Sequence, residues 1–383
     1  MLWFWLSLAV FAGWLWKGGE ILIGGIFLTP RLGDGPAPDS PAPLPKISVI
    51  FAFRNEPAME SALDTLLAQD YPDFEVIAVN DRSGDEASRR LRARGSDRLK
   101  VADVRELPAG WLGKTHALCE GVRASGGEWL LFTDADVRFG PGALARAVGM
   151  IHKEKLDHLV LFPRMVLRGL WEGIYVSAFI ISFWMRYRPW AARFRRSRAF
   201  VGVGAFNMVR REVYDRIGTH EAFCMEVADD MMLGKLVKEA GFRQMAASGE
   251  RFVSVRWAEG FKGIVASIRK NAFTGFHYNS AFLAVGVTAA VVINLSPYAA
   301  AIWGDGAARV SGLLAIGIIF LVYLGMARHM GVRALVYFLA HPAGVLLFLG
   351  VVVYSAVSVS RQGGVIWRGT FYSLEELKRH HKM

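Results

Sequence analysis

The stretch that decides the fold is residues 128–136, which read EWLLFTDAD. Residues 128–133 have the apolar pattern of a buried strand, and Pro141 opens a helical pattern just beyond them. Earlier in the chain, residues 47–52 and 75–79 form two similar strand patterns, each followed by a helical one. This alternation predicts an α/β domain with a mostly parallel sheet and helices on both of its faces.

Polar side chains stand where these predicted strands end, and the carboxyl ends of parallel strands are where α/β sheets bind ligands. Asp134 and Asp136 follow the strand at 128–133. Side chains at i and i+2 of an extended chain point the same way, so this pair suits a hard divalent cation, Mg²⁺ or Mn²⁺, that neutralises a departing diphosphate. A turn in which an aspartate caps the next helix is the competing interpretation.

The other predicted strand ends carry matching chemistry. Phe53, Arg54 and Glu56 follow the first strand, and Asp81 follows the second, where its carboxylate is suited to accept the N–H of a uracil ring. Lys114 opens another helix, where backbone N–H groups and an ammonium group approach a phosphate. Turn chemistry would explain any one of these residues. Their recurrence at successive strand ends favours a nucleotide site.

The apolar residues gather at the two ends of the chain, which is 53% hydrophobic with a mean hydropathy of +0.29. One apolar run opens the chain, and three more lie between residues 281 and 360, each about long enough to span a bilayer. A cleaved signal peptide fits the first run less well, because no Lys or Arg precedes it. We therefore predict a membrane anchor over residues 1–30, a Pro-rich linker over 31–45, a globular domain over 46–278, transmembrane helices over 279–360 and a basic tail over 361–383.

Two segments bear on how the chain meets the membrane. Residues 170–190 are apolar and aromatic and lead into an arginine-rich stretch, which predicts an interfacial helix, with a buried helix and a solvated basic loop as the alternative. The last apolar run contains His341-Pro342, where a kink or a re-entrant hairpin is expected. Three full spans after the globular domain would put the basic tail on the opposite side of the membrane, whereas its charge favours the cytoplasm. A last segment that does not span would remove this conflict.

The charge and the cysteines exclude other classes of protein. The formal net charge is +11, but many basic residues flank apolar blocks, where anionic lipid headgroups explain them. No nucleic-acid-binding motif accompanies the charge, so we expect no nucleic-acid partner. Cys119 and Cys224 lack partners at metal-ligand spacing and read as core residues in a reducing compartment.

In combination, these motifs resemble glycosyltransferase family 2, whose inverting members have the nucleotide-diphospho-sugar transferase (GT-A) fold. The matching segments are Phe53-Arg54-Asn55-Glu56, Asn80-Asp81-x-Ser83, Gly113-Lys114 and Asp134-Ala135-Asp136. The membrane layout and the ending at residues 367–372 are similar to the branch that holds ceramide glucosyltransferases and hopanoid-associated or carotenoid glycosyltransferases. The resemblance implies that Asp81 holds the uracil, that Asp134 lies near the ribose and diphosphate, and that Asp136 ligates the metal.

The resemblance also assigns the remaining candidate residues. The family's third acidic motif aligns with Asp229-Asp230, so that Asp230 is the general base and Asp229 stands where Glu is usual. Both acids would equally suit the start of a helix. The family's Gln-x-x-Arg-Trp motif is missing, and Arg269 or Lys270 is the loosely assigned substitute for its diphosphate-facing cation. Gly202-Val203-Gly204 lies either beside the sugar or in close backbone packing.

These expectations combine into one hypothesis. An integral protein of the inner, cytoplasmic membrane would move one sugar from a UDP-sugar to a lipid hydroxyl, with its catalytic domain in the cytoplasm. Two alternatives stay open, a processive polysaccharide synthase of the same fold and an inactive transferase fold that serves as a membrane scaffold. The missing Gln-x-x-Arg-Trp motif argues against the first, and the retained acids argue against the second.

Overall fold

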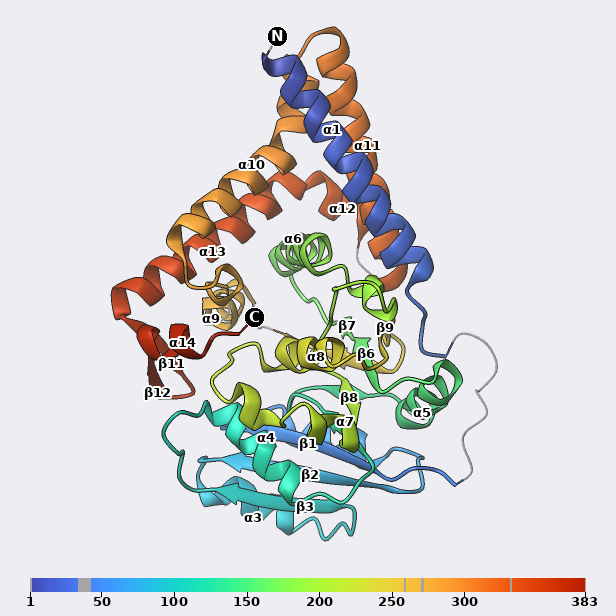
Figure 1. Cartoon of the computed structure of the whole chain (residues 1–383), viewed down its shortest axis with the longest axis vertical. Coiled ribbons are helices and arrows are strands. Elements are labelled where there is room, and N and C mark those ends of the chain that lie inside the picture. The colour runs from blue at the N-terminus through green and yellow to red at the C-terminus, as the bar shows by residue number, and fades with distance from the viewer. Residues whose placement is uncertain (1, 34–42, 258–259, 270–271, 331–332, 383) are drawn as a thin grey trace. The chain divides into compact units, whose positions relative to one another are not determined.

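The computed structural model describes residues 2–33, 43–257, 260–269, 272–330 and 333–382 (Figure 1). Its contacts divide the chain into two compact units, each built from three segments. The helical unit comprises Met1–Thr29, Leu167–Arg188 and Ala258–Val365, and the sheet unit comprises Pro30–Val166, Pro189–Trp257 and Ile366–Met383. Most of the predicted Pro-rich linker, as well as Lys270, lies outside the described residues.

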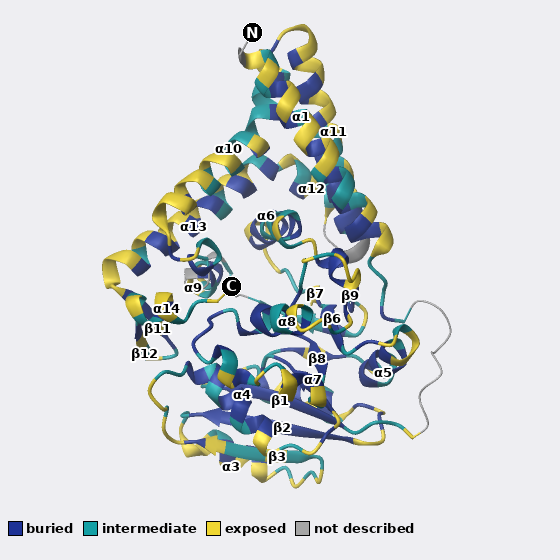
Figure 2. Cartoon of the chain, viewed as in Figure 1, coloured by how far each residue is buried: buried dark blue, intermediate teal, exposed yellow. Residues whose placement is uncertain are grey.

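The sheet unit is built on a seven-stranded sheet in the order β3-β2-β1-β4-β8-β6-β9, in which only β8 runs antiparallel to its neighbours. The strands are β1 (Ile47–Phe53), β2 (Phe74–Asp81), β3 (Leu99–Val104), β4 (Trp129–Phe132), β6 (His158–Phe162), β8 (Asn207–Arg210) and β9 (Gln244–Ser248). The prediction of a mostly parallel sheet is thereby confirmed. The first strands are buried along their whole length, which explains why their sequences are continuously apolar (Figure 2).

Helices cover both faces of this sheet, because alternate residues of each strand point to opposite sides. Val49 and Phe51 of β1 pack against α2 (Met59–Leu67) and α5 (Ala143–Glu154). Ile50 and Ala52 share a second apolar cluster with α4 (Gly113–Arg123) and α8 (Asp229–Glu239). The remaining helices and small sheets of this unit are α3 (Asp85–Arg92), α7 (Arg211–Arg216), the three-stranded sheet β5-β10-β7 (Arg138–Phe139, Val253–Val255, Arg164–Met165) and the tail helix α14 (Leu374–His380).

The helical unit holds the apolar ends of the chain. Its elements are α1 (Leu2–Glu20), the π-helix Ile21–Leu28, α6 (Leu170–Tyr187), α9 (Gly260–Arg269), α10 (Ser280–Trp303), α11 (Gly306–Met330), α12 (Ala334–Leu339) and α13 (His341–Gln362). Among the described residues, four helical segments are long and apolar enough to cross a membrane: Trp3–Leu28, Ser280–Trp303, Gly306–Ala327 and His341–Gln362. They indicate a membrane protein. Many of their apolar residues are exposed (Figure 2).

Two details refine the sequence-based prediction of these helices. The segment predicted over residues 334–360 is broken at Ala340, between α12 and α13, next to the kink expected at His341-Pro342. The helix predicted over 170–190 is α6, which buries ten of its 18 residues within the described chain and packs against α9 and α13. Its placement at a membrane interface stays a prediction.

A two-stranded hairpin joins the units in sequence. Its strands are β11 (Gly364–Trp367) and β12 (Thr370–Ser373), connected by the two-residue turn Arg368-Gly369. Both turn residues have positive φ, 49° and 77°, as a type I′ turn requires. From Ile366 onward the tail belongs to the sheet unit.

Candidate active site

Three parallel strands bring their carboxyl ends to one edge of the sheet. Phe53 pairs with Asn80 across β1 and β2, and Ile50 pairs with Phe132 across β1 and β4. This register sets the residues after each strand side by side, as the sequence led us to expect. Two groups of charged side chains result, one around Asp81 and the other around Lys114.

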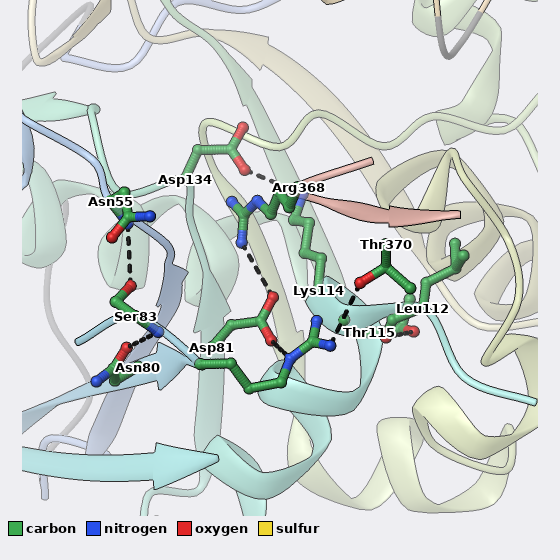
Figure 3. A network of polar contacts seen from close by, with 12 residues as sticks. Asn55, Asn80, Asp81, Ser83, Leu112, Lys114, Thr115, Asp134, Arg368 and Thr370 are labelled. Carbon is green, nitrogen blue, oxygen red and sulfur yellow. Dashed lines mark hydrogen bonds and ion pairs between the residues drawn. The ribbon is translucent and has the colours of Figure 1, made fainter. Parts of the chain in front are cut away.

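The first group, which we term the Asp81 cluster, consists of Arg54, Asp81, Arg82 and Arg368, and Figure 3 shows the contact between Asp81 and Arg368. The Asp81 side chain is fully buried. Arg82 Nε donates to Asp81 Oδ1 at 2.8 Å, and Arg368 Nη1 lies 3.7 Å from Asp81 Oδ2. A Cβ added at Gly369 would lie 3.4 Å from Arg54 Nη2. One carboxylate is therefore set between two guanidinium groups, and a third, that of Arg54, lies beside Gly369 next to Arg368 in the chain.

Local turns hold this edge in shape. Asn80, buried in β2, donates to Ser88 Oγ at 2.8 Å and accepts from the backbone N–H of Ser83 at 2.9 Å. Asn55 has a φ of 50° and donates its backbone N–H to Ser83 Oγ at 3.0 Å. Glu56 Oε1 accepts from the backbone N–H of Ala58 at 3.2 Å. Asn80 thus fixes the loop that carries Asp81.

The second group, the Lys114 cluster, consists of Lys114, Asp134, Asp136, Asp229 and Asp230. Lys114 Nζ lies 3.0 Å from Asp134 Oδ1 and 3.2 Å from Asp229 Oδ1, and its side chain is 13% exposed. Burial alone would lower the pKa of Lys114, but the three carboxylates of Asp134, Asp229 and Asp230 raise it well above its usual value. Lys114 therefore stays charged and ties the acids after β4 to those that begin α8.

Asp134 and Asp136 lie in a turn between β4 and β5, so the expectation that they continue an extended strand is wrong. The backbone N–H of Val137 donates to the carbonyl oxygen of Asp134 at 3.3 Å, because the chain reverses here to bury Val137 in the core. The two carboxylates still interact. Burial, then Asp134 and Glu56, raise the pKa of Asp136 to about 7.

Asp229 and Asp230 are the first two residues of α8. Asp230 Oδ1 accepts from the backbone N–H of Met231 at 2.8 Å. Burial raises the pKa of Asp230, Asp229 raises it further, and Lys114 opposes both effects. A carboxyl group with a raised pKa is a better proton acceptor than an ordinary aspartate, which is what a general base requires.

Two glycines permit the close approach of chain segments at this cluster. A Cβ at Gly204 would lie 2.5 Å from Asp134 Oδ2, and a Cβ at Gly202 would clash with the carbonyl group of Asp230. The close-packing interpretation of Gly202-Val203-Gly204 is therefore correct for the backbone. A pocket beside these residues is lined by Lys114, Leu118, Phe132, Thr133, Gly204, Asn207, His220, Asp229, Asp230 and Leu233.

The donor set around Asp136 suits a hard cation that is shared with a phosphate. Within the described residues, no group of three or more His, Cys, Asp or Glu side chains is arranged to hold a metal by itself. Mg²⁺ and similar ions are commonly held by one or two carboxylates, with phosphate oxygens and waters completing the shell. The mutual repulsion of Asp134 and Asp136, evident in the raised pKa of Asp136, is the condition that such a cation relieves.

The sequence-predicted residues do not all meet. Phe53 ends β1 as a buried core residue, whereas Arg54, Asp81, Lys114, Asp134 and Asp230 lie in the two clusters. Arg269 is the last residue of α9, in the helical unit, and Lys270 lies outside the described residues. The choice of Arg269 or Lys270 as the diphosphate-facing cation therefore stays a prediction.

Sequence reasoning missed three contributors. Asn207 Nδ2 donates to the carbonyl oxygen of Asp230 at 3.2 Å. His220 lines the pocket, and burial, with Lys114, lowers its pKa to about 3, so it stays neutral. Arg368 reaches Asp81 from nearly 290 residues away in sequence. Nothing in the local patterns marks Asn207 or His220, while Arg-Gly between two strand patterns is a hairpin-turn pattern that would have indicated the bend at Arg368.

Comparisons with known proteins agree with this geometry. The profile described as Glycosyl transferase family 2 matches residues 48–218. A 4,4'-diaponeurosporenoate glycosyltransferase of Staphylococcus aureus (strain MRSA252) is 23% identical over 343 residues, covering 86% of this chain and 89% of the relative. The enzyme of the same name from strain USA300 is 22% identical over 341 residues with the same coverage. A mannosyltransferase from Pyrobaculum calidifontis, solved with GDP-Man and Mn2+, matches 93% of this chain and 98% of its own with a TM-score of 0.53 and 17% identity.

The sheet order and the structural match define the GT-A fold. More particularly, residues 48–218 match the glycosyltransferase family 2 profile, and the chain is a glycosyltransferase. The resemblance that the motifs suggested, including the likeness to carotenoid glycosyltransferases, is confirmed.

Proposed function

We propose that this glycosyltransferase moves one sugar from a UDP-sugar to a lipid acceptor, with a divalent metal bound at Asp134 and Asp136 and with Asp230 as the general base. The observation that carries the proposal is the position of Lys114, which contacts Asp134 and Asp229 at 3.0 and 3.2 Å. Through these contacts it joins Asp134, one of the acids suited to the donor phosphates, to Asp229, which lines the pocket with Asp230.

Each residue of the Lys114 cluster then has a distinct task. Asp134 and Asp136 would hold Mg²⁺ or Mn²⁺, which when bound supplies positive charge to the departing diphosphate. Lys114 adds a fixed, buried positive charge and keeps the two acidic segments together. Asp230 takes the proton of the acceptor hydroxyl. As it does so, the hydroxyl oxygen bonds to the anomeric carbon, and the bond between that carbon and the diphosphate breaks. Attack from the side opposite the diphosphate inverts the anomeric centre.

The chemistry of the acceptor decides whether a base is needed. The relatives are named for diaponeurosporenoate, and that name denotes a carboxylate. A carboxylate attacks without losing a proton, whereas a hydroxyl needs a base such as Asp230. We propose a hydroxyl-bearing lipid for this chain, because Asp230 lines the pocket with a raised pKa. A lipid carboxylate is the second candidate, and the relatives favour it.

The membrane arrangement follows from where the tail lies. His381 Nδ1 is 3.2 Å from Glu226 Oε2, and Tyr372 Oη accepts from the backbone N–H of Gly113 at 3.1 Å, so the tail shares the sheet unit. An even number of crossings must therefore separate Trp257 from Ile366. Three candidate spans lie between them.

We propose that α10 and α11 cross the membrane and that α13 does not, with the predicted anchor, transferase domain and basic tail otherwise as inferred from the sequence. α13 is the candidate span that packs against α6 and α9, which flank the transferase segments in sequence. The basic tail then lies in the cytoplasm with the catalytic domain, in accord with the positive-inside rule. Labelling of single cysteines introduced at both ends of α13 would test this, since labels reaching the two ends from opposite sides would contradict it.

The activity itself can be tested on the full chain in lipid nanodiscs. Labelled UDP-sugars, Mn²⁺ and a lipid extract should give a lipid product heavier by one hexose or one N-acetylhexosamine. Comparing lipids from cells with and without the protein by mass spectrometry would then identify the acceptor. Polymer formation would support the synthase alternative. Failure of every UDP-sugar to be transferred or hydrolysed would contradict the proposal.

A further inference from the structure

The tail hairpin completes the Asp81 cluster, a role that neither the family motifs nor the comparisons assign to it. Arg368 lies 3.7 Å from Asp81, and Thr370 Oγ1 accepts from Arg82 Nη1 at 3.4 Å (Figure 3). Gly369 packs against the guanidinium of Arg54, and the Tyr372 hydroxyl accepts a hydrogen bond from the backbone N–H of the first residue of α4. The hairpin therefore touches the ends of β1 and β2 and the start of α4 at once.

The buried atoms of this cluster leave hydrogen-bonding capacity unused. Asp81 Oδ2, Arg82 Nη2 and Arg368 Nη1 are all inaccessible to solvent and have no hydrogen-bond partner within the described part of the chain. Buried polar groups are nearly always paired in folded proteins, so three such atoms around one carboxylate mark a place where a ligand bonds. The side chain of Asp81 is 0% exposed, which makes its unused acceptor especially costly without one.

These three atoms form a pattern. Arg82 approaches Oδ1 of Asp81 and Arg368 approaches Oδ2, so the guanidinium donors flank the carboxylate acceptor on two sides. The sequence donor, acceptor, donor complements an edge that offers acceptor, donor, acceptor. Uracil has this edge, with its imide N–H between two carbonyl groups. Cytosine replaces one carbonyl with an amino group and the N–H with a bare nitrogen, so it mismatches the pattern.

Two backbone features preserve this arrangement of donor and acceptor atoms. Glycine at position 113 leaves the space beside them open, because a Cβ there would lie 2.6 Å from Asp81 Oδ2 and 2.5 Å from Arg82 Nη2. Arg368 has a φ of 49°, a conformation that non-glycine residues seldom adopt and that recurs at functional sites. The I′ turn requires this φ and thereby fixes where the guanidinium starts.

We propose that Arg368 is a specificity-determining residue for the donor, and that with Arg82 and Asp81 it binds the imide edge of uracil. This deepens the proposed function and rests on it. The C-terminal hairpin thus supplies the base-binding part of the donor site with a cation from the far end of the chain.

The test compares nucleotides on the full chain in nanodiscs. UDP and CDP binding would be measured by calorimetry or competition for wild type, Arg368→Ala and Arg368→Lys, with Arg379→Ala as a matched control, because Arg379 is an exposed arginine of the same tail. A lost hydrogen bond from a charged donor lowers affinity by about 10- to 150-fold. We expect Arg368→Ala to weaken UDP within that range while CDP changes little, so that the preference for UDP shrinks, with partial recovery in Arg368→Lys.

Two results would overturn the inference. An equal loss for UDP and CDP would mean that Arg368 binds the phosphates or only supports the hairpin, and an unchanged UDP affinity would mean that it binds no nucleotide. In kinetics, the donor KM should rise while kcat at saturating donor stays within a few-fold. Wild-type protein that binds no UDP would contradict the proposed function as well, whereas active wild type with an unaffected Arg368→Ala variant would contradict this inference alone.

Discussion

The two charged clusters of the site are opposite in sign. In the Asp81 cluster two guanidinium groups flank one carboxylate, whereas in the Lys114 cluster one ammonium group interacts with four carboxylates. The first therefore has an excess of positive charge, and the second lacks it. In the proposed complex, the neutral imide edge of uracil takes up the unused hydrogen bonds of the first cluster, and a divalent cation supplies positive charge to the second. The donor would thus complete the first cluster by hydrogen bonding, whereas the metal would complete the second by charge.

The largest effect should come from reducing the charge difference at the acidic end. Asp136→Ala should lower turnover by at least about 10³-fold, because a bound cation contributes several kcal/mol to the transition state. The variant should also lose the metal-dependent part of its UDP affinity. Asp215→Ala, which removes an exposed carboxylate from α7, is the matched control. Turnover within tenfold of wild type would contradict the assignment of Asp136 to the metal.

The Asp136→Ala variant also tests the acidic Lys114 cluster in the absence of substrate. Asp136 has a folded pKa of about 7, above the usual 3.8, so its ionisation opposes folding increasingly as the pH rises from 3.8 to 7. At pH 8 without metal, Asp136→Ala should therefore melt at the same temperature as wild type or higher. Added Mn²⁺ should raise the melting temperature of wild type and not that of the variant.

The next largest effect concerns the proton acceptor. Asp230→Asn should keep UDP binding but lower kcat by about 10²–10⁴-fold with a hydroxyl acceptor, the usual contribution of a general base. With a carboxylate acceptor the loss should be small, because no proton is removed. Asp215→Asn is the control. Retained turnover on a hydroxyl lipid would remove Asp230 from the base role and leave it as the residue that begins α8.

The dependence on pH should follow from the same residue. Burial and Asp229 raise the pKa of Asp230 above 3.8, and a base is active only when deprotonated, so kcat should fall as the pH drops through this raised value. Below it the rate should decline by about tenfold per pH unit. Profiles of wild type and Asp230→Asn at saturating donor and metal would check this. An acidic limb that persists unchanged in the variant would assign the proton to another group.

Much of the fold could be predicted from the sequence, because buried parallel strands consist of continuous apolar residues. The strands at 47–52, 75–79 and 128–133 fall within or beside β1, β2 and β4, and the polar residues after them do meet at one edge. Short strands such as β8 and β9 were not predicted, because the periodicity of four or five residues is too short to distinguish a strand from other apolar segments.

The site was predictable only where contacts are local. Asp81 and Asp134 were found because Asp81 ends β2 and Asp134 stands two residues beyond β4, and register alone brings such positions together. Arg368 was missed because its contact with Asp81 depends on the helical unit returning the chain to the sheet unit. The prediction of an extended chain at Asp134-Ala135-Asp136 was wrong, because Val137 turns inward to the core. The alternation of side chains at i and i+2 takes no account of such a turn.

The smallest effect should come from loosening the hairpin while its arginine stays. Tyr372→Phe removes the hydroxyl that accepts the Gly113 N–H at 3.1 Å, so a buried donor at the start of α4 loses its partner. Leaving such a donor unpaired costs about 1–3 kcal/mol of stability. The melting temperature should fall, and UDP affinity should fall only a few-fold, since Arg368 still reaches Asp81. Phe371→Ala, at an exposed position one residue away, is the control. A loss of UDP affinity as large as that of Arg368→Ala would mean that the position of the hairpin, more than its guanidinium, decides how the nucleotide binds.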